Sequence, residues 1–417
     1  MKPTIYWHYI ALHCFLLWSS PSLSIITMTS TTHWTVKSAW SKAGVGTNIV
    51  LELKCAPDHA KTKTKKRPAC VAFDMGATPC FDDAILANYV FLSHGHIDHV
   101  GALFSHARAH AVSCGGEAPT YFVPAQLLPQ IEQCRHAMSL IDSFTTTTSN
   151  DENKNNGREN LLTMTLVPVN PGDEFPLKGI AYGSKTTFFV RAFEVDHAGH
   201  TALGYVMGSR TMASGLKQEY QNLDGNTIRE LVQSGVSVKE TATVEKIEVA
   251  YSGDTCRNGL IKNSLHSPES VEEHLSKSAT YLQQAFQAEL LICELTFLDS
   301  AEDEAQMQRS VERGHLHMND LEDIFASHGR LNSHDETKSV LFYHLSGRYG
   351  PASRALEYIA TGLPSQIRNS CHVAIKSLLS EKEKAAADGI QMLIQPNGCI
   401  SVEDYLRWRK ESNNAAA

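Results

Sequence analysis

The run FLSHGHIDHVGAL, residues 91–103, constrains this chain more strongly than any other stretch. Apolar residues lead into it and predict a buried strand, and Gly95 lets the chain bend sharply directly afterwards. Around the bend lie four potential metal ligands in an H-x-H-x-D-H pattern: His94, His96, Asp98 and His99. The first two can point the same way at a strand end, and the last two follow the bend. One short loop can therefore serve two adjacent metal ions.

Other apolar strands of the sequence also end in residues that bind metals or support a metal site. They are Asp74, His197, Asp254, Glu294 and His344. His200 competes with His197 for the same role. When several strands deliver such side chains to one rim, the rigid sheet holds a metal cleft in place. Asp74, which a Gly turn follows, is expected to support ligands rather than to bind metal itself.

These residues divide into two zinc sites. The ligands of the first ion are His94, His96 and His197, those of the second are Asp98, His99 and His344, and Asp254 bridges the two ions. Imidazole and carboxylate groups suit zinc, at bond lengths of roughly 2.0–2.2 Å. Two ions about 3.5–4 Å apart activate water and stabilise the attacking and leaving oxygens, which suits phosphodiester hydrolysis particularly well.

Cleavage of a phosphodiester also requires a proton for the leaving oxygen. A protonated histidine that is paired with a carboxylate can supply it. Glu294 and His317 remain once the ligands are assigned, so we expect His317 to act as the general acid and Glu294 to position it. His315, two residues earlier in the run GHLHMND, is the alternative to His317. Asp98 is counted among the catalytic residues as well as among the ligands.

The composition describes a globular chain without a general affinity for polyanions. Of its 417 residues 42% are hydrophobic, which is ample for a large core, and the formal net charge is −8. A nucleic-acid substrate must therefore be bound by local patches and by the metals. The ten cysteines form no C-x-x-C pair, which predicts reduced, mostly buried thiols rather than a disulfide scaffold.

The N-terminal residues allow two interpretations. Lys2, the apolar run 9–18 and the small-x-small pattern Ser22-Leu23-Ser24 resemble a secretory or organellar leader. Alternatively, translation starts at Met28 and residues 1–27 are not translated. The first case predicts a plastid or mitochondrial protein, and the second a cytoplasmic or nuclear one. The apolar run is too short to span a membrane, which takes about 20 residues, so we expect no membrane association.

Residues 31–410 are expected to form one domain. Segment 144–160 is almost entirely polar and is predicted to be a disordered insert, and 411–417 a disordered tail. The basic loop 61–67 is interpreted as a solvated hairpin tip or as an RNA-phosphate contact. Residues 216–239 predict two short helices that are either an ordinary connection or a substrate arm. Strands are predicted at 48–53, 70–73, 89–92, 120–123, 164–169, 187–195, 201–208, 247–252, 290–295, 340–343 and 391–394, and helices at 103–111, 125–140 and 279–287.

Residues 35–350 resemble the metallo-β-lactamase superfamily, and within it the ribonuclease Z family in its short, plant-type form. The motif SHGHIDHVGAL is similar to the superfamily signature, and the family resemblance rests on FDMG at 73–76, SGDT at 252–255, ELTFLD at 294–299 and HLSGRY at 344–349. It implies an α/β fold, a four-layer αβ/βα sandwich with two zinc ions. It also implies an endoribonuclease that removes the 3′ trailer of precursor tRNA, leaves a tRNA 3′-hydroxyl and works as a homodimer. It favours His197 over His200 and gives Glu294 and His317 the proton-transfer role.

The chain departs from the family pattern at two points. The long Gly-Pro-rich arm of bacterial members is absent, and the usual histidine-plus-hydroxyl pair reads His317-Met318-Asn319. Two other functions are considered: a hydrolase of the same fold that acts on a small phosphodiester or thioester, and a catalytically inactive scaffold or RNA-binding subunit. An inactive subunit predicts lost ligands, yet all seven ligand positions are filled.

Overall fold

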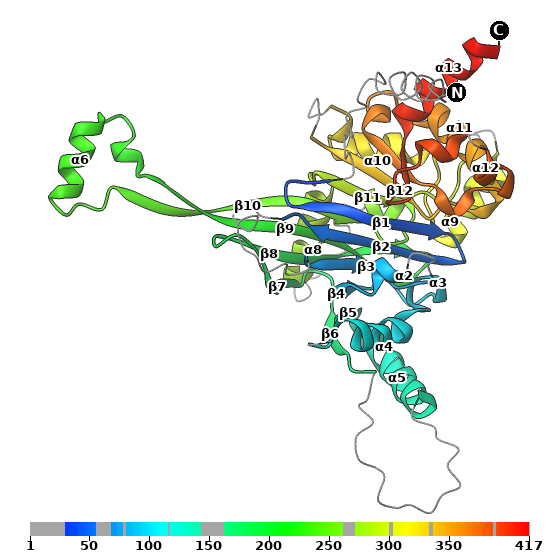
Figure 1. Cartoon of the computed structure of the whole chain (residues 1–417), viewed down its shortest axis with the longest axis horizontal. Coiled ribbons are helices and arrows are strands. Elements are labelled where there is room, and N and C mark those ends of the chain that lie inside the picture. Colours follow the sequence, from blue (N-terminus) through cyan, green and yellow to red (C-terminus); the bar gives the residue numbers. More distant parts are fainter. Residues whose placement is uncertain are drawn as a thin grey trace, which may run out of the picture.

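Two β-sheets face each other, and helices cover the outer side of each sheet (Figure 1). The computed structural model describes residues 30–55, 68–77, 81–115, 117–142, 162–261, 272–299, 303–332, 337–386 and 389–416. The predicted leader, the basic loop 61–67 and the insert 144–160 lie outside the described residues. Within these ranges no helix combines the length and the hydropathy that crossing a bilayer requires.

The first sheet has six strands in sequence order, antiparallel among β1–β3 and parallel from β3 to β6. They are β1 (Trp34–Lys42), β2 (Gly46–Leu53), β3 (Cys70–Phe73), β4 (Ala87–Phe91), β5 (Thr120–Pro124) and β6 (Thr165–Val169). The predicted strands in this half of the chain are confirmed to within about two residues at each end. The three parallel strand pairs bring the carboxyl ends of β3 and β4 to the same edge of the sheet.

The second sheet has eight strands in the reverse of sequence order, from β14 to β7, and strands β10–β13 run parallel. They are β7 (Glu174–Tyr182), β8 (Thr186–His197), β9 (His200–Leu216), β10 (Lys239–Tyr251), β11 (Leu290–Glu294), β12 (Ser339–Tyr343), β13 (Cys371–Ala374) and β14 (Cys399–Ser401). The strand predicted at 391–394 is wrong, because that segment forms a 3-10 helix, η8 (Ile390–Leu393). The strand that pairs with β13 begins only after a turn at Gly398, whose φ is +89°.

Helices pack on the outer face of both sheets. The first sheet is covered by α2 (Phe81–Ala84), α4 (Leu103–Cys114) and α5 (Leu128–Asp142), the last preceded by η2 (Ala125–Leu127). The second is covered by α7 (Arg257–Ile261), α8 (Glu272–Ala285), α10 (Asp320–Ser327), α11 (Ala352–Gly362) and α13 (Val402–Ala416). The remaining short helices are α3 (Ile97–Val100), α9 (Glu304–Arg313), α12 (Glu381–Ala385), η4 (Arg330–Asn332), η5 (Gly347–Tyr349), η6 (Arg368–Ser370) and η7 (Lys376–Leu378). The tail predicted to be disordered from 411 is helical up to Ala416.

An aromatic core fills the space between the sheets. Phe73 of β3 stacks on Tyr251 of β10 with ring centroids 4.7 Å apart, and Phe91 of β4 lies 5.4 Å from Tyr205 of β9. These rings are fully buried, and aromatic side chains contribute large apolar areas to a core. Helix, sheet, sheet and helix therefore form four layers, and the predicted αβ/βα sandwich is confirmed.

A long arm leaves the body of the molecule (Figure 1). It consists of the antiparallel strands β9 and β10, which pair from Tyr205–Tyr251 out to Leu216–Lys239. Its tip carries η3 (Gln218–Tyr220) and α6 (Gly225–Gln233). Asp224 caps α6 by accepting from the backbone N–H groups of Asn226 and Thr227. Of the two predicted helices, the second is confirmed as α6 and the first is a three-residue 3-10 turn. The strands on either side extend much further than the sequence suggested.

Candidate metal centre

The carboxyl ends of strands from both sheets meet at one edge of the sandwich. In the first sheet β3 is followed by Asp74 and β4 leads to His94. In the second sheet β8 ends at His197 and β11 at Glu294, while β10 ends shortly before Asp254 and β12 directly before His344. Strand β8 shares the direction of β10 because each is antiparallel to β9. All seven predicted metal ligands thus come from one edge, and side chains from the two sheets lie within contact distance there.

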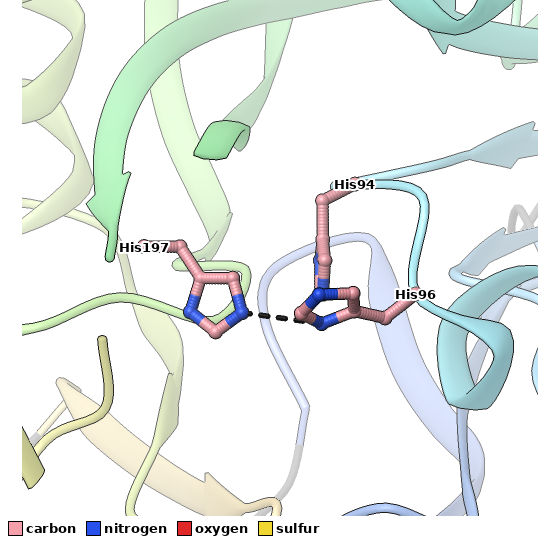
Figure 2. A group of neighbouring side chains, drawn as sticks. All are labelled: His94, His96 and His197. Carbon is pink, nitrogen blue, oxygen red and sulfur yellow. Dashed lines mark hydrogen bonds between the residues drawn. The ribbon is translucent and has the colours of Figure 1, made fainter. Parts of the chain in front are cut away.

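The first group of ligands is His94, His96 and His197, and Figure 2 shows the three rings facing one another. His94 and His96 come from the loop after β4, and His197 is the last residue of β8. His197 Nε2 lies 3.3 Å from His96 Nδ1. The competing His200 is exposed, its ring centroid is 6.2 Å from that of His197, and it belongs to none of the ligand groups found among the described residues.

The second group is Asp98, His99 and His344. His344 Nε2 lies 3.4 Å from Asp98 Oδ2 and 3.4 Å from His99 Nε2. Asp254 lies between the two groups, because its Oδ2 is 3.1 Å from His99 Nε2, 3.2 Å from His344 Nε2 and 4.0 Å from His94 Nε2. The structure brings the seven residues together, and the two predicted ligand groups are among several overlapping groups that the described residues form at this edge.

The donor atoms of this centre fit a divalent transition-metal ion. His94 Nε2 and Asp254 Oδ1 are buried and have no hydrogen-bond partner among the described residues, although buried polar atoms are normally bonded. His99 Nδ1 donates to Asp74 Oδ2 (2.7 Å) and His197 Nδ1 to the Gly314 carbonyl (2.8 Å). A bonded Nδ1–H leaves the Nε2 lone pair free for a metal. Imidazole nitrogens and carboxylate oxygens that converge in this way favour a bound cation.

Asp74 supports two histidines of the first sheet at once. Its carboxylate accepts from Ser93 N (2.7 Å), Ser93 Oγ (2.8 Å), His99 Nδ1 (2.7 Å) and Tyr251 Oη (2.5 Å). Ser93 Oγ in turn lies 3.0 Å from His94 Nδ1. Asp74 therefore orients His99 directly and His94 through one hydroxyl group, which is the supporting role expected from the sequence.

Glu294 has the same arrangement on the second sheet. Its Oε2 accepts from Thr296 Oγ1 at 2.6 Å, and that hydroxyl lies 3.0 Å from His344 Nδ1. Its Oε1 accepts from the backbone of Thr255 and Leu316. Sequence reasoning missed Ser93 and Thr296; each lies within two residues of a carboxylate or histidine that it did identify, and that proximity was the available signal.

His315, and not His317, is the histidine that contacts Glu294. His315 Nδ1 lies 3.3 Å from Glu294 Oε1 and 3.9 Å from Asp254 Oδ2. No contact between Glu294 and His317 is present among the described residues. His317 instead takes part in the turn that opens α10, where its Nδ1 accepts from Asn319 N and its backbone N–H donates to Asp320. The expected pairing of Glu294 with His317 is therefore corrected to Glu294 with His315.

The surroundings of these two histidines move their pKa values in opposite directions. Burial lowers the pKa of His315, but Glu294 and Asp254 outweigh burial and raise it to about 9. Burial lowers the pKa of His317. Burial also opposes ionisation of Asp98, yet His344 and His99 lower the pKa of Asp98 to about 2. In the metal-free protein the nearby carboxylates thus favour the protonated form of His315.

Backbone strain is concentrated at this edge. Asp74, Ala198 and His344 are the non-glycine residues with positive φ in the described part of the chain, at +56°, +49° and +64°. Each is a ligand, a supporting carboxylate or the neighbour of a ligand. Such conformations cost on the order of 1–3 kcal/mol and persist where the surrounding structure fixes them, commonly at functional sites.

No family model matches the chain. It is 28% identical to tRNase Z TRZ1 of Arabidopsis thaliana over 294 residues, which cover 70% of this chain and 84% of that protein. It is 26% identical to the chloroplastic tRNase Z TRZ2 of the same plant over 304 residues, 72% of this chain and 64% of the relative. It is 31% identical to the nuclear ribonuclease Z of Triticum aestivum over 173 residues, 42% of this chain and 82% of the relative.

Proposed function

This chain belongs to the ribonuclease Z family, and from that membership we propose that it is an endoribonuclease that removes the 3′ trailer from precursor tRNA. The cut would leave a 3′-hydroxyl on the tRNA. The observation that carries the proposal is the convergence of seven ligand-type side chains with the Glu294–His315 pair at one edge of the sandwich. Relatives over most of the chain are named tRNase Z.

Two zinc ions are the metals that we assign to the centre. His94, His96 and His197 would hold the first, Asp98, His99 and His344 the second, with Asp254 between them. When bound, two such ions lower the pKa of water and stabilise the attacking and leaving oxygens of the phosphodiester. The protein contributes the orientation of the ligands, because Asp74 and Glu294 hold three of these imidazoles by their Nδ1 atoms.

We assign the general acid to His315. Its Nδ1 faces Glu294, so its Nε2 is free to give a proton to the departing 3′-oxygen of the tRNA. The Glu294 carboxylate stabilises the charged imidazole before the proton is transferred. His317 lacks this carboxylate partner and accepts a backbone hydrogen bond at Nδ1.

The arm is proposed to contact the tRNA away from the cut. Residues 212–244 hold three basic and four acidic side chains, a net charge of −1, so the arm cannot bind phosphates by charge alone. Met212, Leu223, Val232 and Val244 are exposed along it. Leu216 and Lys239 are cross-strand partners, so an Asn-Gly turn can replace residues 217–238 without changing the register. The shortened protein should keep its activity on small phosphodiesters and lose most of its affinity for precursor tRNA.

We propose a homodimer that is formed through the outer helices of the first sheet. Val112 of α4 and Met138 and Ile141 of α5 are exposed, at 62%, 39% and 68%. Exposed apolar clusters on a folded surface commonly mark an interface with another protein. Light scattering of the purified protein should give twice the mass of the chain, and Ile141→Glu should give the mass of one chain. A wild-type protein that elutes as a monomer would refute the dimer.

The compartment depends on which N terminus the cell uses. One relative is named chloroplastic and another nuclear. We propose that a chain starting at Met28 acts in the cytoplasm or nucleus, and that a chain made with the leader acts in a plastid or mitochondrion. The N-terminal residue of the protein isolated from its own cells decides between them.

The function is tested with two substrates. Zinc-loaded protein is incubated with a precursor tRNA and, separately, with bis(p-nitrophenyl) phosphate, and the 3′ end of the tRNA product is mapped. We expect one cut at the trailer and none with His94→Ala. Hydrolysis of the small ester without a cut at the trailer would instead support a hydrolase of small phosphodiesters. Cleavage by the His94→Ala protein would refute the metal mechanism.

A further inference from the structure

The tip of the β1–β2 hairpin is built into the rim of the metal centre. Gly44 N donates to Asp98 Oδ2 at 2.8 Å, and the backbone N–H of His344 donates to Ser41 Oγ at 3.1 Å. Ala43 N donates to the carbonyl of Leu345. The tip therefore touches a ligand of the first sheet and a ligand of the second, and its position is fixed relative to both.

Close packing excludes other positions for the tip. A β-carbon on Gly46 would lie 2.0 Å from the carbonyl oxygen of Ala77, and one on Gly76 would lie 1.9 Å from the carbonyl oxygen of Asp98. Gly76 N donates to the carbonyl of Thr47. Since there is no room for side chains here, the hairpin, the loop after β3 and the histidine loop are held together by backbone contacts.

Lys42 lies at this tip, and its side chain crosses the segment that follows His344. A β-carbon on Gly347 would come within 2.8 Å of Lys42 Cε and 3.5 Å of Lys42 Nζ. The lysine stem is half-buried. Gly347 is three residues beyond His344, so the ammonium group lies against the segment that follows this ligand.

The Lys42 ammonium group has no carboxylate partner and no hydrogen bond among the described residues. Other cations of the protein do have partners: Lys37 pairs with Glu52, and Arg348, in the same segment as Gly347, pairs with Asp299. Arg348 also lies over the rings of Phe297 and Tyr349. In a chain with a formal net charge of −8, an unneutralised cation at the rim of a metal centre attracts an anion.

We infer that Lys42 binds a phosphate of the bound RNA, one that flanks the scissile phosphate. A lysine ammonium acts as a point charge for phosphate and tolerates several geometries. The scissile phosphate must lie at the metal-binding side chains themselves. Lys42 instead lies against the segment beyond His344, where the RNA chain continues past the scissile phosphate. This inference rests on the proposed function, since it requires an RNA substrate at the centre.

Steady-state kinetics on precursor tRNA at several salt concentrations tests the inference. One lost phosphate contact should reduce the slope of log KM against log salt by about 0.7–0.9. We expect Lys42→Met to raise KM about 5- to 10-fold at about 0.1 M salt, because one phosphate contact and its counterion release are lost. Lys42→Arg should keep both KM and the salt slope at the wild-type values. Lys37→Met is the matched control on the same strand, and it should leave the slope unchanged.

Two results would overturn the inference: an unchanged salt slope in Lys42→Met, or a loss of zinc from that variant, which would show that Lys42 acts through the metal centre. Wild-type protein that leaves precursor tRNA intact would refute the proposed function instead. In that case the uncleaved, labelled RNA is titrated separately with the wild-type protein and with Lys42→Met, and binding is followed by fluorescence anisotropy. Equal affinities would then refute the role of Lys42, and a weaker Lys42→Met complex would support it.

Discussion

Glu294 is joined to His344 by a single hydroxyl group, that of Thr296, which lies 2.6 Å from Glu294 Oε2 and 3.0 Å from His344 Nδ1. The other oxygen of the same carboxylate faces His315. One buried carboxylate thus holds a proposed metal ligand and the proposed proton donor. The orientation of His344 and the charge on His315 both depend on Glu294.

Thr296→Val should weaken metal binding and slow catalysis, because it removes this hydroxyl and keeps the shape of the side chain. Loss of a partner that orients a metal ligand typically costs 10- to 100-fold in metal affinity or activity. Zinc affinity, measured by competition with a chelator, and kcat on precursor tRNA check the prediction. Thr296→Ser, which keeps the hydroxyl, should remain within about threefold of the wild type. Equal behaviour of the two variants would mean that the hydroxyl does not orient His344.

His315→Ala should slow cleavage of precursor tRNA by about 10²- to 10⁴-fold, the usual contribution of a general acid. The loss should be much smaller on bis(p-nitrophenyl) phosphate, because p-nitrophenolate leaves without a proton. His317→Ala is the comparison, and it should show no such difference between the two substrates. If His317→Ala rather than His315→Ala separated the substrates, the assignment of the acid would have to be reversed.

His197→Ala should bind one zinc ion instead of two, because His197 supplies one of three donors to the first group and its Nδ1 is already held by Gly314. His200→Ala is the matched control, since His200 is three residues away and belongs to no ligand group among the described residues. It should keep both ions. Atomic absorption on dialysed protein measures both variants. Removal of the metals with a chelator should abolish RNA cleavage in all of them, and added zinc should restore it in the wild type.

His372→Leu should make the metal-free protein more stable, above all in acid. His372 of β13 is fully buried opposite Leu341, and neither of its ring nitrogens has a hydrogen-bond partner in the part of the chain that the structure describes. Burial lowers its pKa to about 4. The unfolded chain takes up a proton near pH 6.5, but the folded chain does so only near pH 4. His372 therefore leaves the free energy of unfolding unchanged above pH 6.5. Below pH 6.5 it lowers this free energy, by about 3 kcal/mol at pH 4. Urea unfolding between pH 7 and 4 measures this loss, which the variant should lack.

His106→Leu provides the opposite case. Burial lowers the pKa of His106 to about 3, but both of its nitrogens are bonded, one to Tyr121 Oη at 2.6 Å and one to the Ala84 carbonyl at 2.9 Å. The leucine would leave these buried groups without a partner, so the variant should lose about 1–3 kcal/mol at pH 7. A gain in stability for His106→Leu at pH 7, or a loss for His372→Leu, would contradict the argument from bonding.

Short buried strands and the histidine loop could be predicted because local pattern decides them. Strand β3 was predicted to the residue, and the ligands at strand ends followed from the rule that parallel strands share an edge. The strand predicted at 391–394 is wrong because a short apolar run shows no periodicity that distinguishes a strand from a helix. In the protein this segment forms η8, and the chain turns at Gly398.

Within the candidate site, residue types could be predicted but several contacts could not. His315 is half-buried and His317 is buried in the same segment, and the choice between them depends on the turn that opens α10, in which His317 takes part. The positive φ of Asp74 and His344 and the docking of Gly44 on Asp98 depend on packing between distant segments. No local pattern records such contacts, so the role of the β1–β2 hairpin was missed.

The division of the ligands between two sheets has a consequence for how the protein is made. His94 to His99 follow β4 of the first sheet, and His344 follows β12 of the second sheet, much later in the chain. The second group of metal-binding side chains is therefore complete only after β12 has been synthesised. A nascent or truncated chain that ends before His344 lacks one of these side chains. We expect such fragments to have no nuclease activity, so RNA near the ribosome is protected until synthesis of the domain is almost complete.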